Sequence, residues 1–308
     1  MATFDGELLK KTKQSAAEVV FIGNSMLDTR MDRALWREIS LPNKSHFLSV
    51  PGSRTLAYYC LLKNFASQMK HPPKLVILFY RDYDFHRLDD HIDGIHLTRL
   101  RELMVPEDEP LLHRARGGLQ GSGKWKDVFA ENFLPEKTAT HARKKVKELA
   151  YDVAALGSKE GDDVLEQAVQ DTFLPKNFRK DAAEDGASEE SGVGVNPQVF
   201  NGESSASLLP EFLALARSMG AKLCFYRVKK RPNEANVTEQ SEAVRTYTAA
   251  FRAWAEKNGC VLVDETEDPA LTLAMYHDGD HLGEHAKAEY TRLFLDRMKF
   301  LLPRAVNP

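Results

Sequence analysis

Five short runs rich in apolar and β-branched residues alternate with candidate helices, and this alternation constrains the fold more than any other feature of the sequence. The predicted strands are Val19–Ile22, Phe47–Val50, Leu75–Tyr80, Lys222–Val228 and Cys260–Val263. Apolar residues at helical spacing predict helices over Asp28–Ile39, Thr55–Met69, Leu208–Met219, Thr238–Asn258 and Gly283–Leu302. Strand–helix alternation is typical of a parallel sheet with crossover helices. The sequence therefore predicts an α/β fold, with a doubly wound parallel five-stranded sheet in a flavodoxin-like three-layer sandwich.

The alternation breaks between the third and fourth predicted strands. Residues 86–206 are polar and charged and carry no strong strand pattern. Within them, residues 180–194 are rich in Ala, Glu, Asp, Ser and Gly, which predicts a mobile acidic loop. We predict a single α/β domain over residues 1–308, with its core in 18–85 and 207–302. Residues 86–206 are then a helical or irregular insertion, or a cap.

The composition and net charge of the chain are those of an ordinary globular protein. The chain has 308 residues, of which 43% are hydrophobic and 28% charged, as in ordinary soluble globular proteins. A net charge of −3 gives no indication of a nucleic-acid partner. Cys60, Cys224 and Cys260 are far apart in the sequence and form no Cys-x-x-Cys pair, so we interpret them as small buried apolar residues. We expect neither a metal nor a cofactor.

The sequence leaves the compartment open. No apolar run is long enough to predict a transmembrane segment. Met1–Lys13 is polar and lacks the apolar centre of a signal peptide. Two interpretations fit these facts: a cytoplasmic protein, or an extracytoplasmic domain trimmed of its signal or anchor. The oligomeric state does not follow from the sequence either.

A glycine-flanked serine follows the first predicted strand, in the segment Gly23-Asn24-Ser25. In an open α/β sheet, the carboxyl ends of the strands are where ligands bind. A tight turn at this end of the strand can present the Ser25 hydroxyl to a crevice. The alternative is that Ser25 only caps the helix that follows.

A carboxylate and an imidazole lie close in sequence just before the last predicted helix. Asp278 and His281 are separated by two residues. On a tight loop, this spacing lets a carboxylate bind one imidazole nitrogen while the other nitrogen faces outward, as in the base and its orienting group in serine hydrolases. The alternative is a solvated loop in which Asp280 caps the helix.

Taken together, these segments resemble the SGNH (GDSL-like) hydrolase family. Gly23-Asn24-Ser25 matches the first sequence block of that family, with Asn24 where many members have Asp. Gly52, after the second predicted strand, matches the second block, and Asp278-Gly-Asp-His281 matches the last. The resemblance covers Glu18–Tyr83 and Ser207–Leu302.

The resemblance implies a serine esterase or O-acyltransferase that acts on acyl esters, often acetyl groups on carbohydrate. Ser25 is then the nucleophile, His281 takes its proton, and Asp278 fixes the imidazole tautomer. The backbone N–H groups of Ser25 and Gly52 form the oxyanion hole. The partner is a small-molecule or polysaccharide ester, and an acyl-enzyme is resolved by water or by a sugar hydroxyl.

One block of the family pattern is missing. The third block usually supplies an Asn after the third strand, but here Tyr80 is followed by Arg81-Asp82. An ionised Asp has no proton to donate and repels a developing oxyanion. Losing one donor typically costs about 10²- to 10³-fold in rate. We place Asn24, Arg81 and Asp82 in the wall of the site, with Arg81 as an alternative donor or as the ion-pair partner of Asp82.

Three functions therefore remain open. The first is the serine esterase or acyltransferase. The second, favoured by Asp82, is a non-catalytic carbohydrate-binding or assembly protein on the same fold. The third is a flavodoxin-like nucleotide-binding or regulatory domain, in which the Asp-x-x-His spacing is coincidental. The cations Arg227, Lys229, Lys230 and Arg231 after the fourth strand either shape a site for an anionic polymer or form a solvated loop.

Overall fold

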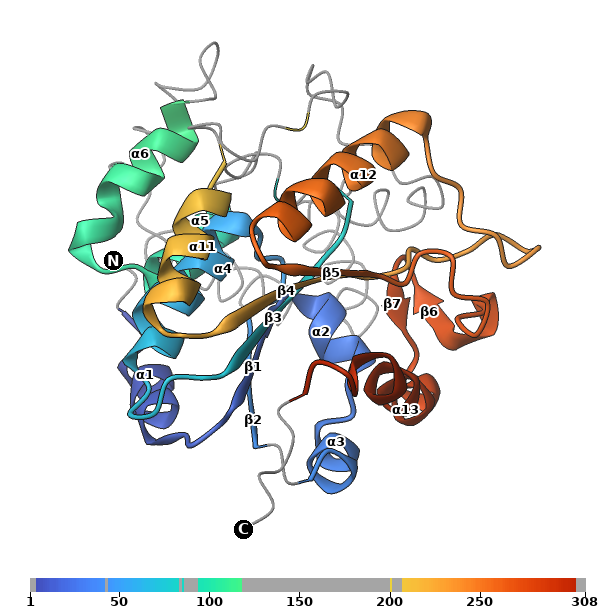
Figure 1. Cartoon of the computed structure of the whole chain (residues 1–308), viewed down its shortest axis with the longest axis horizontal. Coiled ribbons are helices and arrows are strands. Elements are labelled where there is room, and N and C mark those ends of the chain that lie inside the picture. The colour runs from blue at the N-terminus through green and yellow to red at the C-terminus, as the bar shows by residue number, and fades with distance from the viewer. Residues whose placement is uncertain are drawn as a thin grey trace, which may run out of the picture. The chain divides into compact units, whose positions relative to one another are not determined.

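The computed structural model describes residues 4–41, 44–82, 85, 94–117, 200 and 207–302. All the described residues belong to one compact unit, which contains a parallel sheet between two sets of helices (Figure 1).

The central sheet has five parallel strands in the order β2-β1-β3-β4-β5. They are β1 (Val19–Gly23), β2 (Ser45–Ser49), β3 (Leu75–Tyr80), β4 (Lys222–Arg227) and β5 (Val261–Asp264). This confirms the predicted doubly wound five-stranded sheet. The strand order changes direction between β1 and β3, and in open α/β sheets such a switch point opens a crevice at the carboxyl ends of the strands. Asn24 and Ser25 follow β1 at this edge.

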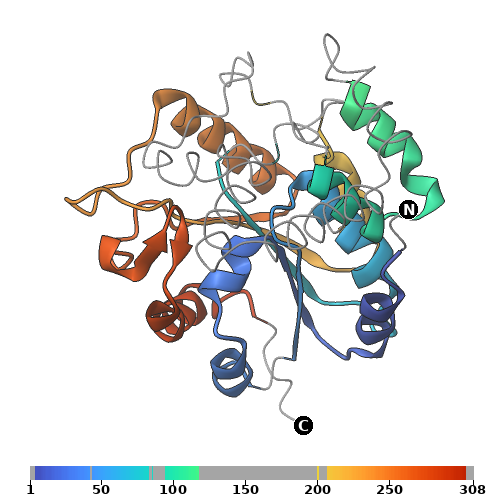
Figure 2. The same ribbon diagram turned by 180° about the vertical axis from the view of Figure 1, so that it is seen from behind.

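Helices cover both faces of the sheet. They are α1 (Gly6–Gln14), α2 (Ser25–Arg30), α3 (Arg33–Ile39), α4 (Thr55–Cys60), α5 (Gly94–Leu103), α6 (Glu109–Gly117), α11 (Leu209–Ser218), α12 (Glu242–Lys257) and α13 (Lys287–Met298). In Figures 1 and 2, α4, α11 and α12 lie over one face, and α2, α3 and α13 lie over the other. A short antiparallel hairpin, β6 (Tyr276–Asp278) with β7 (His281–Leu282), precedes α13.

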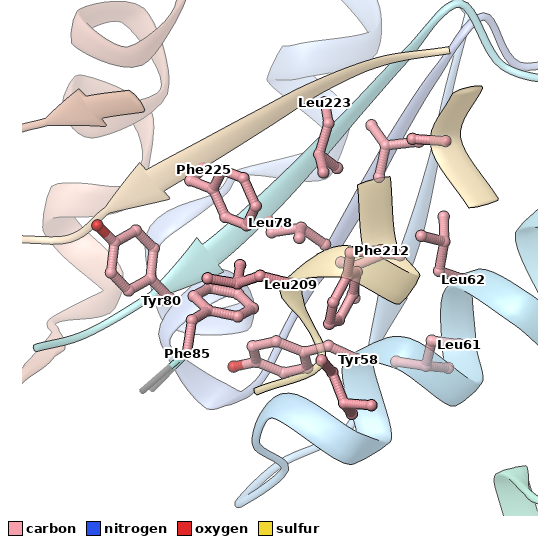
Figure 3. Packing of buried hydrophobic residues seen from close by; sticks show 14 of the residues in the cluster. Tyr58, Leu61, Leu62, Leu78, Tyr80, Phe85, Leu209, Phe212, Leu223 and Phe225 are labelled. Carbon is pink, nitrogen blue, oxygen red and sulfur yellow. The ribbon is translucent and has the colours of Figure 1, made fainter. Parts of the chain in front are cut away.

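The strands supply alternate residues to two cores. Val20 and Leu78 are buried in the first core, against the face covered by α4, α11 and α12. Phe21 and Ile77 are buried in the second core, against α2, α3 and α13. Because both faces are covered, a central strand is apolar along its whole length and shows no polar alternation. Figure 3 shows the first core, where residues of α11 and α4 pack against the side chains of β3 and β4.

Two details of the predicted helices are wrong. The single helix expected over Asp28–Ile39 is two helices, α2 and α3, separated at Met31 and Asp32. The Asp32 carboxylate accepts the N–H groups of Ala34 and Leu35, both at 3.0 Å, and so begins α3. An Asp within an apolar periodicity can start a new helix in this way.

The helix expected over Thr55–Met69 also differs from the prediction. The N-cap of α4 is Arg54, without a side-chain hydrogen bond. The Ser53 hydroxyl is buried and has no partner among the described residues. Beyond α4 the expected helix continues as a π-helical segment, Leu61–Phe65, and a short 3-10 turn, Ala66–Gln68. The predicted apolar face is nevertheless buried in the first core.

Helices α5 and α6 lie within the range assigned to the insertion. Leu100 and Leu103 of α5 and Leu112 of α6 are buried in the first core. Residues 118–199, which include the expected acidic loop at 180–194, lie outside the described residues. The insertion and its loop therefore stay predictions.

The three cysteines are free and buried, as predicted. Within the described ranges, no helix combines the length and the apolar character needed to cross a membrane. Across the same ranges, no group of three or more His, Cys, Asp or Glu side chains is placed to hold a metal ion.

Phe294 tests the second core. Its ring is fully buried and lies 5.5 Å from that of Trp36 and 4.8 Å from that of Tyr226, centroid to centroid. Phe294→Ala should lower the free energy of unfolding by about 3–5 kcal/mol, because it removes buried area and leaves a cavity. Phe300→Ala, at a position that is 69% exposed just beyond the same helix, should change it by less than about 0.5 kcal/mol. Equal losses in urea unfolding would contradict this packing.

Candidate active site

The turn after β1 presents Ser25. A Cβ at Gly23 would lie 2.8 Å from the Cβ of Leu27 and 3.1 Å from that of Phe79, so the close approach of α2 to the strand requires glycine. Asn24 is the N-cap of α2, and its Oδ1 accepts the N–H of Met26 at 2.9 Å. The cap is thus Asn24, and the alternative that Ser25 merely caps the helix is wrong.

Asn24 has a second contact that shapes the edge of the sheet. Its Nδ2 donates to the carbonyl oxygen of Ser53 at 3.1 Å. This bond joins the turn after β1 to the loop that carries Gly52. Ser25 is the first residue of α2, where backbone N–H groups have no acceptor within the helix. The Ser25 N–H therefore lies at a helix end suited to bind negative charge.

His281 lies within hydrogen-bond distance of Ser25. Its Nε2 is 2.9 Å from the Ser25 Oγ. In the β6–β7 hairpin, Asp278 and His281 occupy paired positions, and the Asp278 Oδ1 lies 2.8 Å from the His281 Nδ1. An ionised carboxylate is only an acceptor, so Nδ1 carries the proton and Nε2 is left to accept the Ser25 hydroxyl proton. The structure thus brings together the three residues that the sequence proposed.

The charge state of Asp278 fits this arrangement. The hydrogen bond from His281 holds the pKa of Asp278 below its ordinary value, against a smaller opposing effect of burial. The neighbouring imidazole of His277 lowers it further. Asp278 is therefore ionised at neutral pH. Its side chain is 65% exposed and that of His281 is 35% exposed, so the pair lies at the surface of the described unit.

Gly52 has a backbone conformation that favours glycine. Its φ is +73°, and an added Cβ would lie 2.7 Å from the Cε1 of His96. His96 belongs to α5, so a helix from the predicted insertion packs against this loop. The participation of the Gly52 N–H in an oxyanion hole stays a proposal.

Asp82 is surrounded by cations. It has a φ of +47°, and its carboxylate lies 2.6 Å from Lys230, 3.5 Å from Arg227 and 3.8 Å from Arg81. These ion pairs offset the negative charge that the sequence analysis expected to repel an oxyanion. The carboxylate still provides no donor in place of the missing Asn.

The basic residues at the end of β4 and just after it divide between buried and exposed positions. Arg227 and Lys229 are buried. Arg227 pairs with Asp264 at 3.0 Å, and the Lys229 ammonium donates to the carbonyl oxygen of Asp268 at 2.8 Å. Arg227 and Lys229 are therefore internal and paired, whereas Lys230 is partly buried beside Asp82 and Arg231 is exposed.

Three charged residues near the candidate triad were missed or misassigned. Arg30 and Glu265 are fully or almost fully buried, and Asp280 binds Arg81 instead of capping a helix. A signal for Arg30 was present, because an arginine one helical turn after Met26 falls on the apolar face of α2. Glu265 directly follows β5, at the edge where site residues gather.

Comparison with known proteins gives only distant likenesses. No protein-family model and no curated protein sequence matches this chain. A solved structure of a proposed acylhydrolase from Bacteroides fragilis is similar, with 10% identity, a TM-score of 0.42 and coverage of 96% of this chain and 95% of that chain. A GDSL-like lipase from Bacteroides thetaiotaomicron has 11% identity, a TM-score of 0.37 and coverages of 95% and 91%. A proposed platelet activating factor from Streptococcus pneumonia has 11% identity, a TM-score of 0.38 and coverages of 96% and 92%. Because the sequence identities and TM-scores are low, these similarities do not assign a function to this chain.

Asp280 should make the stability of the fold depend on pH. Burial alone would raise the pKa of Asp280, but the Arg81 guanidinium, the Arg231 N–H and Arg30 outweigh it and hold the pKa below its ordinary value. A carboxylate with a depressed pKa stabilises the fold above its unfolded-state pKa of about 3.9, and this stability is lost as the pH falls through the folded-state value.

Asp280→Asn should therefore be less stable than the wild type at neutral pH, and the difference should shrink as the pH falls below about 4. Urea unfolding across this range measures the difference. Asp296→Asn, at an exposed carboxylate of α13, is the control and should stay near the wild type at neutral pH. A difference for Asp280→Asn that stays constant with pH would contradict the assignment.

Proposed function

We propose that this protein is a serine ester hydrolase or O-acyltransferase with Ser25, His281 and Asp278 as its triad. The observation that carries the proposal is the pair of hydrogen bonds at His281: 2.9 Å from Nε2 to the Ser25 Oγ and 2.8 Å from Nδ1 to the Asp278 Oδ1. A serine, an imidazole and a carboxylate in this order are the groups that acyl transfer requires. The likeness of the sequence to the SGNH pattern supports the same assignment.

The proposed reaction has two halves. His281 Nε2 takes the Ser25 proton as Oγ attacks the ester carbonyl, and the resulting imidazolium returns that proton to the departing alcohol. This leaves an acyl group on Ser25. His281 then deprotonates water, or a sugar hydroxyl, which attacks the acyl-enzyme and frees Ser25. Asp278 stabilises the imidazolium in both halves.

We further propose that the N–H groups of Ser25 and Gly52 bind the oxyanion. Arg81 is engaged with Asp280, so we do not assign it as a donor. Without the third-block Asn, the rate should be about 10²- to 10³-fold below that of an enzyme with a complete hole. The family resemblance suggests acetyl esters, including acetylated carbohydrate, as the first substrates to test.

The competing function is carbohydrate binding or assembly without catalysis. Asp82 favours it, because this residue supplies no donor. The ion pairs of Asp82 with Lys230 and Arg227 weaken the electrostatic part of that argument. The intact hydrogen bonds of His281 favour the enzyme, since a binding protein has no need to align an imidazole with a serine hydroxyl.

Hydrolysis of a short-chain aryl acetate tests the proposal. Ser25→Ala and His281→Asn should each lower kcat/KM by at least about 10³-fold. Asp278→Asn should lower it by less, because Asp278 orients the imidazole and neither attacks the ester nor transfers its proton. Ser218→Ala, an exposed serine in α11, is the control and should behave as the wild type. The kcat/KM of each variant is calculated from the concentration of folded protein, which thermal unfolding measures.

Turnover that persists in Ser25→Ala would contradict the proposal. Equal trace rates in the wild type and in Ser25→Ala, with aryl acetates and with acetylated polysaccharide alike, would also count against it. In that case, retention of the wild-type chain on polysaccharide would favour the binding function.

A further inference from the structure

The helix that begins with Ser25 also contacts the hairpin that carries His281. Arg30, in the last turn of α2, is fully buried. Its Nη1 donates to the carbonyl oxygen of Asp280 at 3.0 Å, and its Nη2 donates to that of Lys229 at 2.8 Å. Asp280 immediately precedes His281. Arg30 therefore fixes the peptide group that joins Asp280 to His281, and it does so from the element that holds Ser25.

A buried carboxylate holds Arg30 in place. The Arg30 Nε lies 3.6 Å from the Glu265 Oε1, and both side chains are fully buried. Glu265 in turn accepts the hydroxyl protons of Tyr226 at 2.8 Å and Tyr290 at 3.0 Å. A buried charge is tolerated only when it is paired and hydrogen-bonded, so this network leaves Arg30 little freedom to move.

A second contact holds the same residue from the other side. The Asp280 carboxylate accepts a hydrogen bond from Arg81, which follows β3, and the N–H of Arg231 at 2.8 Å. The carbonyl oxygen of Asp280 thus accepts a hydrogen bond from α2, and its carboxylate accepts hydrogen bonds from the segments that follow β3 and β4. All these hydrogen bonds are made by the residue next to His281, whose imidazole faces Ser25.

We propose that Arg30 and Arg81 are positioning residues that hold the Asp280–His281 peptide so that the His281 Nε2 stays in reach of Ser25. The proposal rests on the proposed function. Neither arginine lies among the groups that bond Ser25 or the imidazole; each acts through Asp280. Misplacement of a catalytic group by about 1 Å can cost about 10²-fold in rate, so a loose hairpin should impair the proton transfer and leave ester binding largely intact.

Arg81 gives the cleaner test, because its side chain is 38% exposed and its replacement should not prevent folding. Arg81→Gln should lower kcat by about 10- to 10²-fold with KM near the wild-type value. Arg81→Lys keeps the charge beside Asp280 and should recover part of the loss. Arg114→Gln is the matched control, since Arg114 is 34% exposed and pairs with Glu211 in α11.

Hydrogen–deuterium exchange gives a readout that is independent of turnover. In Arg81→Gln, the peptide covering residues 276–283 should exchange faster than in the wild type, while peptides from β1 and β3 should not change. Arg30→Lys should show the same local effect and a lower kcat, and is interpreted only if its thermal unfolding remains cooperative. Arg114→Gln should match the wild type in both measurements.

The outcomes separate the two proposals. Ser25-dependent turnover with wild-type kcat in Arg81→Gln overturns the positioning role alone, as does unchanged exchange of the hairpin. Absence of Ser25-dependent turnover overturns the proposed function, and the exchange measurement then still reports whether Arg81 restrains the hairpin. A raised KM with unchanged kcat would make Arg81 a substrate contact and would also overturn the positioning role.

Discussion

The hydrogen bond between Ser25 and His281 joins two residues that are 256 positions apart in the sequence, and the arrangement of the site depends on it. The sheet makes it possible, because β1 ends at the switch point of the strand order and delivers Ser25 to the crevice edge. On the other side, residues of α13, which follows His281, are buried in the second core. Packing thus determines where the segments that carry Ser25 and His281 meet.

Charge is distributed around this bond so that the charged side chains near it have partners. Asp82 is paired with Lys230, Asp280 with Arg81, and Arg30 with Glu265. The fully buried pair of Arg30 and Glu265 contributes little net stability when it is compared with apolar residues of the same volume, but breaking it leaves a buried charge. The value of the three pairs here is geometric: each links a loop at the carboxyl edge of the sheet to a neighbouring element. The site therefore differs from the family pattern in one donor without leaving an uncompensated carboxylate.

The sequence was sufficient to predict what depends on local pattern. Continuous apolar runs that alternate with helices predicted the strands and their parallel orientation. The segments Gly23-Asn24-Ser25 and Asp278-x-x-His281 predicted the residues that the structure brings together. It was insufficient where a residue acts through distant partners. The sequence places Arg30 on the apolar face of α2, but only its contact with Asp280, 250 positions away, reveals what it holds. Likewise, the N–H of Asp32, at the start of α3, donates to the Thr291 hydroxyl at 2.9 Å, and this partner is 259 positions away.

The central claim is that Ser25 is a nucleophile activated by His281. The most direct test is covalent trapping with an aryl or alkyl fluorophosphonate, in which the serine oxygen displaces fluoride from phosphorus, followed by peptide mass spectrometry. We predict one adduct, located on Ser25, which is absent from Ser25→Ala and forms far more slowly in His281→Asn. Labelling of Ser25→Ala at the wild-type rate, or an adduct on another residue only, would contradict the claim.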